Sequence, residues 1–149
     1  MNNAGIKITR FPYEEPYHLR LVIEASNGNL NGCLEYYCNA SDLKGLGHKM
    51  SKFSGKKDEK IAYKLGSERP EDRFAFFFGL EIAALDSVGH CAIKLQMNNN
   101  RPMPYTEVCG FCISADLGDI NRLGSLFSTF AKLEHQILKW SVGEGELLK

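Results

Sequence analysis

Residues 17–38 read YHLRLVIEASNGNLNGCLEYYC, and the architecture of the whole chain can be built outward from this stretch. Apolar and polar side chains alternate on both sides of Asn27-Gly28, a period of two that is typical of antiparallel strands with one buried face. Asn and Gly tolerate the positive φ angles of a tight turn. The stretch therefore predicts a hairpin whose strands are residues 17–26 and 30–38.

The same period of two recurs on both sides of the hairpin. It predicts four more strands, over residues 6–11, 60–65, 90–97 and 106–115. Residues 73–86 are apolar on both faces, which predicts a central strand covered on both sides. Apolar residues spaced three or four apart predict two amphipathic helices. These helices are residues 42–53 and a segment that begins at Gly118-Asp119, with an apolar stripe of Ile120, Leu123, Phe127, Phe130 and either Ile137 or Trp140.

The expected order of elements is βββαββββα. Short turns between strands favour antiparallel neighbours, because a parallel pair needs a long crossover. We therefore expect an α+β fold: a twisted, mainly antiparallel sheet of about seven strands, or the same sheet folded into two layers, with two helices packed on it. Residues 1–149 are expected to form a single domain, with an N-terminal strand and extension over 1–16 and a flexible tail over 141–149.

Charge and hydropathy exclude several classes of function. Lys plus Arg and Asp plus Glu both number 18, so the formal net charge is zero. This balance argues against a nucleic-acid-binding protein or a binder of anionic membranes, which depend on clustered cations. The longest apolar stretch, residues 74–80, is far shorter than the roughly 20 residues that cross a bilayer. The first residues lack the layout of a secretory signal, so we expect a cytoplasmic protein.

Cys109 and Cys112 form a CxxC motif within a predicted strand. Residues 109 and 112 of an extended strand point to opposite faces, and no helix begins beside them to lower the pKa of a thiol. We therefore expect packing roles, with no metal and no cofactor. A metal-dependent module that also uses Cys33 and Cys38 as zinc ligands stays open as an alternative. The histidines occur singly, so we assign no catalytic residue and do not expect an enzyme.

The polar face of the hairpin carries a mixture of charged and aromatic side chains. Its members are His18, Arg20, Glu24, Glu35 and Tyr37. Tyr and Arg often anchor protein–protein interfaces. We therefore take these five residues as the candidate partner-binding surface.

A series of landmarks follows in order along roughly residues 18–140. They are Asn27-Gly28 and Gly32 in the hairpin, Asp42-Leu43 opening a helix that ends at Phe53, Leu65-Gly66-Ser67, Gly89-His90 leading into Ile93-Lys94-Leu95 and Asn98-Asn99, and Phe111-Cys112-Ile113 running into Ile120-Asn121-Arg122-Leu123-Gly124. In this order they resemble the WapI-like immunity proteins, small bacterial proteins that accompany secreted polymorphic toxins.

The resemblance implies a non-enzymatic immunity protein that binds a cognate toxin protein and neutralises it. An alternative function is a small-molecule-binding or enzymatic domain, with an apolar cavity lined by the Phe-rich residues 74–78. Pairing of two copies through a free sheet edge, which would give a homodimer, is compatible with either function.

Overall fold

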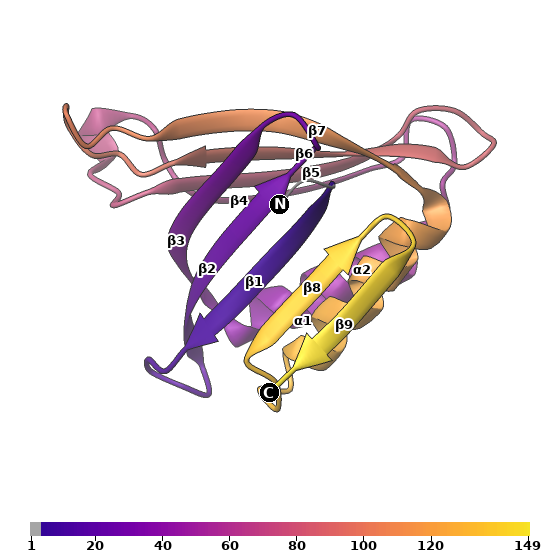
Figure 1. Cartoon of the computed structure of the whole chain (residues 1–149), viewed down its shortest axis with the longest axis horizontal. Coiled ribbons are helices and arrows are strands. Elements are labelled where there is room, and N and C mark those ends of the chain that lie inside the picture. Colours follow the sequence, from indigo (N-terminus) through magenta and orange to yellow (C-terminus); the bar gives the residue numbers. More distant parts are fainter. Residues whose placement is uncertain (1–3) are drawn as a thin grey trace.

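The computed structural model describes residues 4–149 and contains two antiparallel sheets and two α-helices (Figure 1). The elements in chain order are β1 (Gly5–Phe11), β2 (His18–Ser26), β3 (Asn31–Asn39), α1 (Ala40–Ser51), β4 (Lys60–Gly66), a short 3-10 helix (Pro70–Asp72), β5 (Phe77–Ala84), β6 (His90–Asn98), β7 (Val108–Asp116), α2 (Leu117–Phe130), β8 (Ile137–Ser141) and β9 (Glu144–Leu148). The five-stranded sheet has the order β3-β2-β1-β8-β9, and the four-stranded sheet has the order β4-β5-β6-β7.

The expected α+β class, antiparallel pairing and element order βββαββββα are confirmed, and the strands form two layers. The C-terminal region differs from expectation. Helix α2 ends at Phe130 and does not continue to Ile137 or Trp140, which lie in β8. Strand β8 pairs with β1, and β9 pairs with β8 where we expected a flexible tail over 141–149. The backbone of Leu133 has a φ of 62°, which no α-helix accommodates, and pairing with β1 then places Leu138 and Trp140 in the core.

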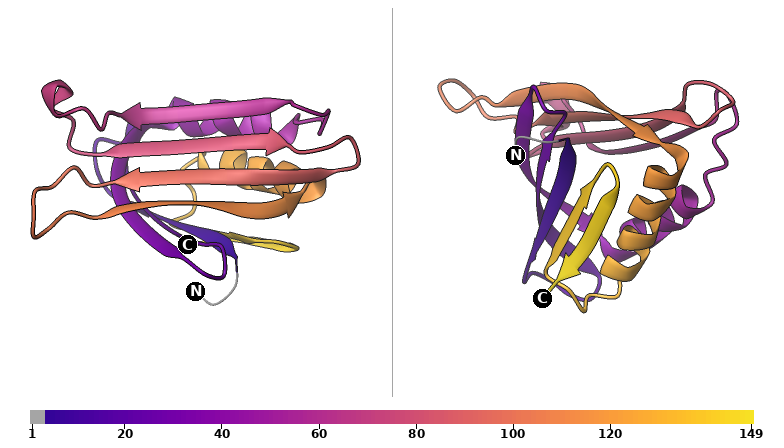
Figure 2. Two further views of the ribbon diagram at one scale, coloured as in Figure 1. Left: turned by 90° about the horizontal axis from the view of Figure 1, so that it is seen from above. Right: turned by 45° about the vertical axis from the view of Figure 1, so that its right-hand side comes forward.

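The two sheets and the helices share one interior. Figure 2 shows the four-stranded sheet as a single layer, with the five-stranded sheet and both helices on the same side of it. Alternate residues of each strand point into this interior, as the burial of Leu19, Leu21 and Ile23 in β2 illustrates. Neither α1 nor α2 is long and apolar enough to span a membrane.

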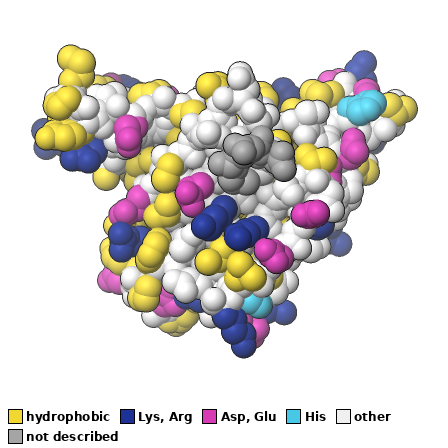
Figure 3. All heavy atoms as spheres, in the orientation of Figure 1, with side chains coloured by type: hydrophobic (Ala, Val, Ile, Leu, Met, Phe, Trp, Pro, Cys, Tyr) yellow, Lys and Arg dark blue, Asp and Glu magenta, His cyan; other side chains and the backbone are white. Residues whose placement is uncertain are grey.

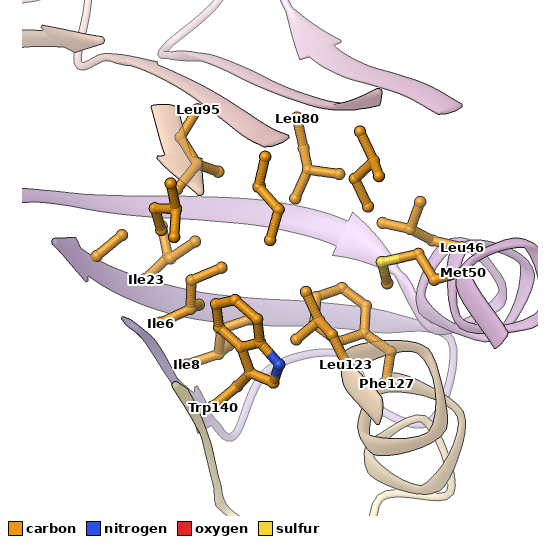
Figure 4. Close-up of a cluster of buried hydrophobic side chains, with 14 of the residues drawn as sticks. Ile6, Ile8, Ile23, Leu46, Met50, Leu80, Leu95, Leu123, Phe127 and Trp140 are labelled. Atoms are coloured by element: carbon orange, nitrogen blue, oxygen red, sulfur yellow. The ribbon is translucent and has the colours of Figure 1, made fainter. Parts of the chain in front are cut away.

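The core is continuous from one sheet to the other and to the helices. Its side chains labelled in Figure 4 are Ile6, Ile8, Ile23, Leu46, Met50, Leu80, Leu95, Leu123, Phe127 and Trp140. Burial of one such side chain contributes about 1.5–3 kcal/mol relative to leaving it in water. Both sheets therefore depend on the helices for the burial of their inner faces.

Helices α1 and α2 cross at two glycines. A Cβ atom at Gly124 would lie 2.3 Å from the backbone nitrogen of Ser51 and 2.8 Å from the carbonyl oxygen of Gly47. A Cβ atom at Gly47 would also be too close to the backbone of α2, at 2.7 Å from the nitrogen of Ser128. The two backbones are thus in direct contact, and any side chain at this crossing would push the helices apart.

A buried carboxylate ties α2 to the C-terminal hairpin. Asp119 is 6% exposed, and its side chain accepts hydrogen bonds from the backbone nitrogens of Asp116 (2.9 Å) and Gly143 (3.0 Å). Arg122 donates to the same carboxylate (2.9 Å). Burial alone would raise the pKa of Asp119, but these hydrogen bonds to the charged form outweigh it and lower the pKa below the ordinary value.

We expect Gly124→Ala to lower the free energy of unfolding by about 1–3 kcal/mol or more, because the added methyl group clashes with backbone that has no room to yield. The matched control is Gly45→Ala in α1, where a Cβ atom meets nothing within 4 Å. That substitution should stabilise the protein by up to about 1 kcal/mol, as Ala does in an exposed helix. Urea denaturation measures the free energy of unfolding of both variants. Equal changes in this free energy would contradict the proposed helix contact.

We expect Asp119→Asn to lower the free energy of unfolding at pH 7 by about 2 kcal/mol, because charge-assisted hydrogen bonds are lost. A folded-state pKa below the ordinary value means that the carboxylate stabilises the fold above about pH 4 and loses this effect as the pH falls further. The difference between variant and wild type should therefore shrink from pH 7 to pH 3. A difference that stays constant in urea titrations at the two pH values would exclude this role.

Candidate partner-binding surface

The structure places all five predicted surface residues on the outer face of β2 and β3. Arg20 lies directly opposite Tyr37 in the β2–β3 ladder, and Glu35 lies two positions further along, opposite Val22. This common face is what the period of two predicts, since each of these residues alternates with a buried neighbour. We call the outer face around Arg20, Glu35 and Tyr37 the outer patch.

Three of the predicted residues contact one another. The guanidinium of Arg20 donates to Glu35 Oε2 at 3.2 Å, and the hydroxyl of Tyr37 donates to Glu35 Oε1 at 3.0 Å. The hydrogen bond from Arg20 is the main reason that the pKa of Glu35 lies below its ordinary value. The hydrogen bond to Glu35 in turn raises the pKa of Tyr37. Glu35 is therefore a carboxylate held ionised between two donors.

The other two predicted residues stand at the margins of the outer patch. His18 Nδ1 lies 2.9 Å from the side-chain oxygen of Asn39, on the last row of the ladder. Glu24 shares the outer face but lies four residues along β2 from Arg20. There it forms an ion pair of 3.8 Å with Lys7 of β1. The prediction thus identified the correct face, whereas the contacts link only Arg20, Glu35 and Tyr37.

Two aromatic residues that we did not predict complete the outer patch. The Cζ atom of Arg20 lies 5.1 Å from the ring centroid of Phe11, at the end of β1. The rings of Tyr13 and Tyr37 are 5.0 Å apart between centroids and tilted by 59°. Phe11 continues the alternation of Lys7 and Thr9 along β1, so the sequence did carry a signal for it. Tyr13 follows Pro12 in a loop, and no periodicity predicts its position.

The outer patch is accessible to a partner. Tyr13 and Tyr37 are 50% and 37% exposed, and the side chain of Arg20 is 39% exposed. Apolar, basic and acidic side chains are interspersed over β2 and β3 in Figure 3. Tyr, Arg and Phe are enriched at protein interfaces because one side chain offers both apolar area and polar contacts. The chemistry of this face fits recognition of a protein surface.

The two cysteines of the CxxC motif lie in β7, which belongs to the four-stranded sheet. Cys109 faces the interior opposite Met97, whereas Cys112 faces outward opposite Lys94. The two thiols of the CxxC motif therefore point to opposite faces, as the strand pattern predicts. Within residues 4–149 no group of three or more His, Cys, Asp or Glu side chains is arranged to hold a metal ion. The geometry gives the zinc alternative no support.

The Phe-rich residues 74–78 do not form one wall of a cavity. Phe74 is 53% exposed and precedes β5, and Phe77 lies on the outer face of the four-stranded sheet. Phe78 points inward and stacks on Tyr36, with ring centroids 4.5 Å apart. The enclosed space beside these rings has a volume of about 10 Å³, which is room for one water at most. The small-molecule alternative thus finds no ligand-sized cavity at this position.

Comparisons with known proteins add little. No family model matches the chain, and no curated protein matches it. Among solved structures the chain shows a weak similarity to the plant transcriptional regulator PBF-2, with 10% identity and a TM-score of 0.45, over 87% of this chain and 76% of that one. A TM-score below 0.5 is too low to support a statement about fold or function. The resemblance to WapI-like immunity proteins stays a prediction from the sequence.

We expect Arg20→Ala to raise the pKa of Glu35 toward its ordinary value of about 4.3, because the main hydrogen bond that stabilises the carboxylate is lost. In the wild type the depressed pKa means that this pair stabilises the fold above about pH 4.3, and the effect is lost as the pH falls. Titration of the Glu35 carboxyl by NMR measures the shift. Lys7→Ala is the control, because Lys7 pairs with Glu24 and not with Glu35. It should leave the pKa of Glu35 unchanged, and an equal pKa shift in both variants would rule out a local cause.

Proposed function

We propose that the chain is a non-enzymatic immunity protein that acts in the bacterial cytoplasm, where it binds and neutralises a cognate secreted toxin. The observation that supports this proposal best is the contact of Arg20 with Glu35 and Phe11 on an exposed sheet face. Side chains of these kinds anchor interfaces, and here they gather on one exposed face of the sheet. The resemblance described above supplies the identity of the partner class.

The construction of the outer patch favours binding. Its side chains stand on β2 and β3, whose inner faces are locked in the core by residues such as Leu21 and Tyr36. The mutual contacts of Arg20, Glu35 and Tyr37 already restrict their side chains before a partner arrives. Binding therefore loses less conformational entropy than it would on a mobile loop, which leaves more of the contact energy for affinity.

The size of the surface is also adequate. A standard protein–protein interface takes about 800 Å² from each partner. The outer face of the five-stranded sheet spans strands of nine residues at β2 and β3 and continues across β1 to β8. We propose that the toxin lies across this face, with Tyr13, Arg20 and Tyr37 near the centre of contact. The protein itself needs no cofactor for this function.

The test begins with the genes that flank the gene for this protein. The proposal expects one of them to encode a toxin domain, which we call the neighbouring toxin domain. We expect co-expression to restore growth of cells that produce the toxin domain, and we expect the two proteins to form a complex. Tyr37→Ala and Arg20→Ala should weaken the complex at least about tenfold, the loss expected for interface anchors. Calorimetry of the purified proteins measures the affinities.

The control is Lys64→Ala, which changes an exposed residue on the outer face of the other sheet and should leave affinity and growth rescue intact. Failure of the wild-type protein both to bind the neighbouring toxin domain and to restore growth would refute the proposed function. Binding that is equally strong in Tyr37→Ala and wild type would place the interface elsewhere on the molecule.

A further inference from the structure

A groove of about 690 Å³ lies where the turn end of the β2–β3 hairpin passes close to β7 (Figure 1). A Cβ atom at Gly32 of β3 would lie 2.5 Å from Met97 Cε and 3.1 Å from Cys109 Sγ, so glycine lets the two sheets approach here. Strands β3 and β7 are each the last strand of their sheet. The groove therefore has a free sheet edge on both sides, and we call it the corner groove.

The backbone of β7 offers hydrogen-bonding groups to the corner groove. The backbone nitrogen of Asn99 donates to the carbonyl oxygen of Glu107 (3.1 Å), and that of Leu117 donates to Gly89 (3.0 Å). Both pairs keep the register of the β6–β7 ladder, so the odd-numbered residues of β7 direct their backbone groups toward β6. The even-numbered residues direct theirs outward, to the free edge, and Val108 does so in the corner groove.

The edge of β7 is better suited to an added strand than the edge of β3. In β3 the carbonyl oxygen of Asn31 already accepts a hydrogen bond from the thiol of Cys109, at 3.7 Å. From Val108 to Ala115, β7 carries no charged side chain, and charge is a common protection of sheet edges against pairing. Strand pairing in the corner groove therefore uses β7.

The corner groove is continuous with the outer patch. Cys33 lines the groove and is exposed, and it lies two residues before Glu35 on the same face of β3. A single partner that lies across the outer patch can therefore also place a segment in the groove.

The charged side chains of the corner groove are both acidic. Glu24 and Glu107 line it, and no Lys, Arg or His of residues 4–149 does so. Glu24 forms the 3.8 Å ion pair with Lys7, whereas the exposed Glu107 forms none in the described part of the chain. Burial raises the pKa of the Cys33 thiol, and the charges of Glu24 and Glu107 raise it further, so the fields of both carboxylates meet at this point. A complementary segment carries Lys or Arg.

We propose that the corner groove binds an extended segment of the toxin domain that carries Lys or Arg and pairs with the free edge of β7. This inference rests on the proposed function. Main-chain hydrogen bonds would hold the segment as an added strand, and the carboxylates of Glu24 and Glu107 would select its side chains. A single strand of nucleic acid does not fit, because the same carboxylates repel its phosphates.

The first experiment measures the affinity of the full-length protein for the neighbouring toxin domain by calorimetry. Glu107→Gln removes the charge and keeps the shape. It should weaken binding about tenfold at low ionic strength, the loss expected for a hydrogen bond to a charged group. Added NaCl should weaken binding of the wild type more steeply than binding of this variant, because salt screens the lost attraction.

The matched control is Glu134→Gln. It removes an exposed charge from the loop that joins α2 to β8, at the opposite end of the five-stranded sheet from the β2–β3 turn. This variant should bind the neighbouring toxin domain like the wild type.

A second pair of variants tests the main-chain pairing. Val108→Pro removes an outward N–H that the β6–β7 ladder does not use, and a strand accepts proline at its first residue. It should weaken binding about threefold or more, whereas Val108→Ala keeps the N–H and should lose less. Urea denaturation checks that both variants fold. Should Val108→Pro fail to fold, Glu107→Gln decides alone.

The outcomes separate this inference from the proposed function. Wild-type affinity in Glu107→Gln, or equal affinities of the two folded Val108 variants, would overturn this inference and leave the proposed function standing. If the wild type forms no complex with the neighbouring toxin domain, both are overturned. A wild-type dimer in sedimentation that Val108→Pro dissociates would assign the edge of β7 to a second copy of the chain, and this inference would again be wrong.

Discussion

The contact between the backbones of α1 and α2 at Gly47 and Gly124 is the constraint on which the rest of the structure depends. It lets two helices occupy the space beneath the four-stranded sheet and beside the five-stranded one. Each sheet then buries its inner face against the same apolar groups, among them Met50 and Phe127. Because one face of each sheet is committed to this interior, the opposite face is left at the surface of the molecule.

Carboxylates in this fold serve two separate purposes. Asp119 is buried and surrounded by donors, so its charge contributes to the internal connection between α2 and the C-terminal hairpin. Glu35 is exposed, and its donors Arg20 and Tyr37 belong to the outer patch. The same chemical group thus stabilises the interior in one place and orders a surface in the other. The difference lies in the surroundings of each group and not in the residue type.

The sequence predicted the structure best where the local alternation of apolar residues agrees with their burial in the fold. The hairpin of β2 and β3 has clear alternation and an Asn-Gly turn, so its faces and the common location of His18 and Tyr37 were predictable. Strands β8 and β9 were not, because each has only five residues, and the spacing from Phe130 to Ile137 equals two helical turns. Strand β8 pairs with β1, which lies at the other end of the sequence, and β9 pairs with β8.

Contacts between side chains were harder to predict than faces. Alternation places Arg20 and Glu35 on one side of a sheet, but their hydrogen bond depends on the register of the ladder, which the turn and the core set together. Tyr13 reaches Tyr37 from a loop. The side chain of Asn100, in the loop of residues 99–107, donates hydrogen bonds to the loop of residues 67–76, which is distant in sequence. Such contacts follow from the assembled fold and leave no local periodicity.

The central position of β1 in the five-stranded sheet affects how the protein is made. Ile6 in β1 has Trp140, far along the chain in β8, as its ladder partner. During synthesis one side of β1 therefore stays without its native neighbour until β8 (Ile137–Ser141) has been made. Contacts this distant in sequence slow folding, and an unpaired strand edge is prone to association with other chains in the meantime. The edge of β1 that faces β8 is thus open to pairing with other chains until β8 is in place.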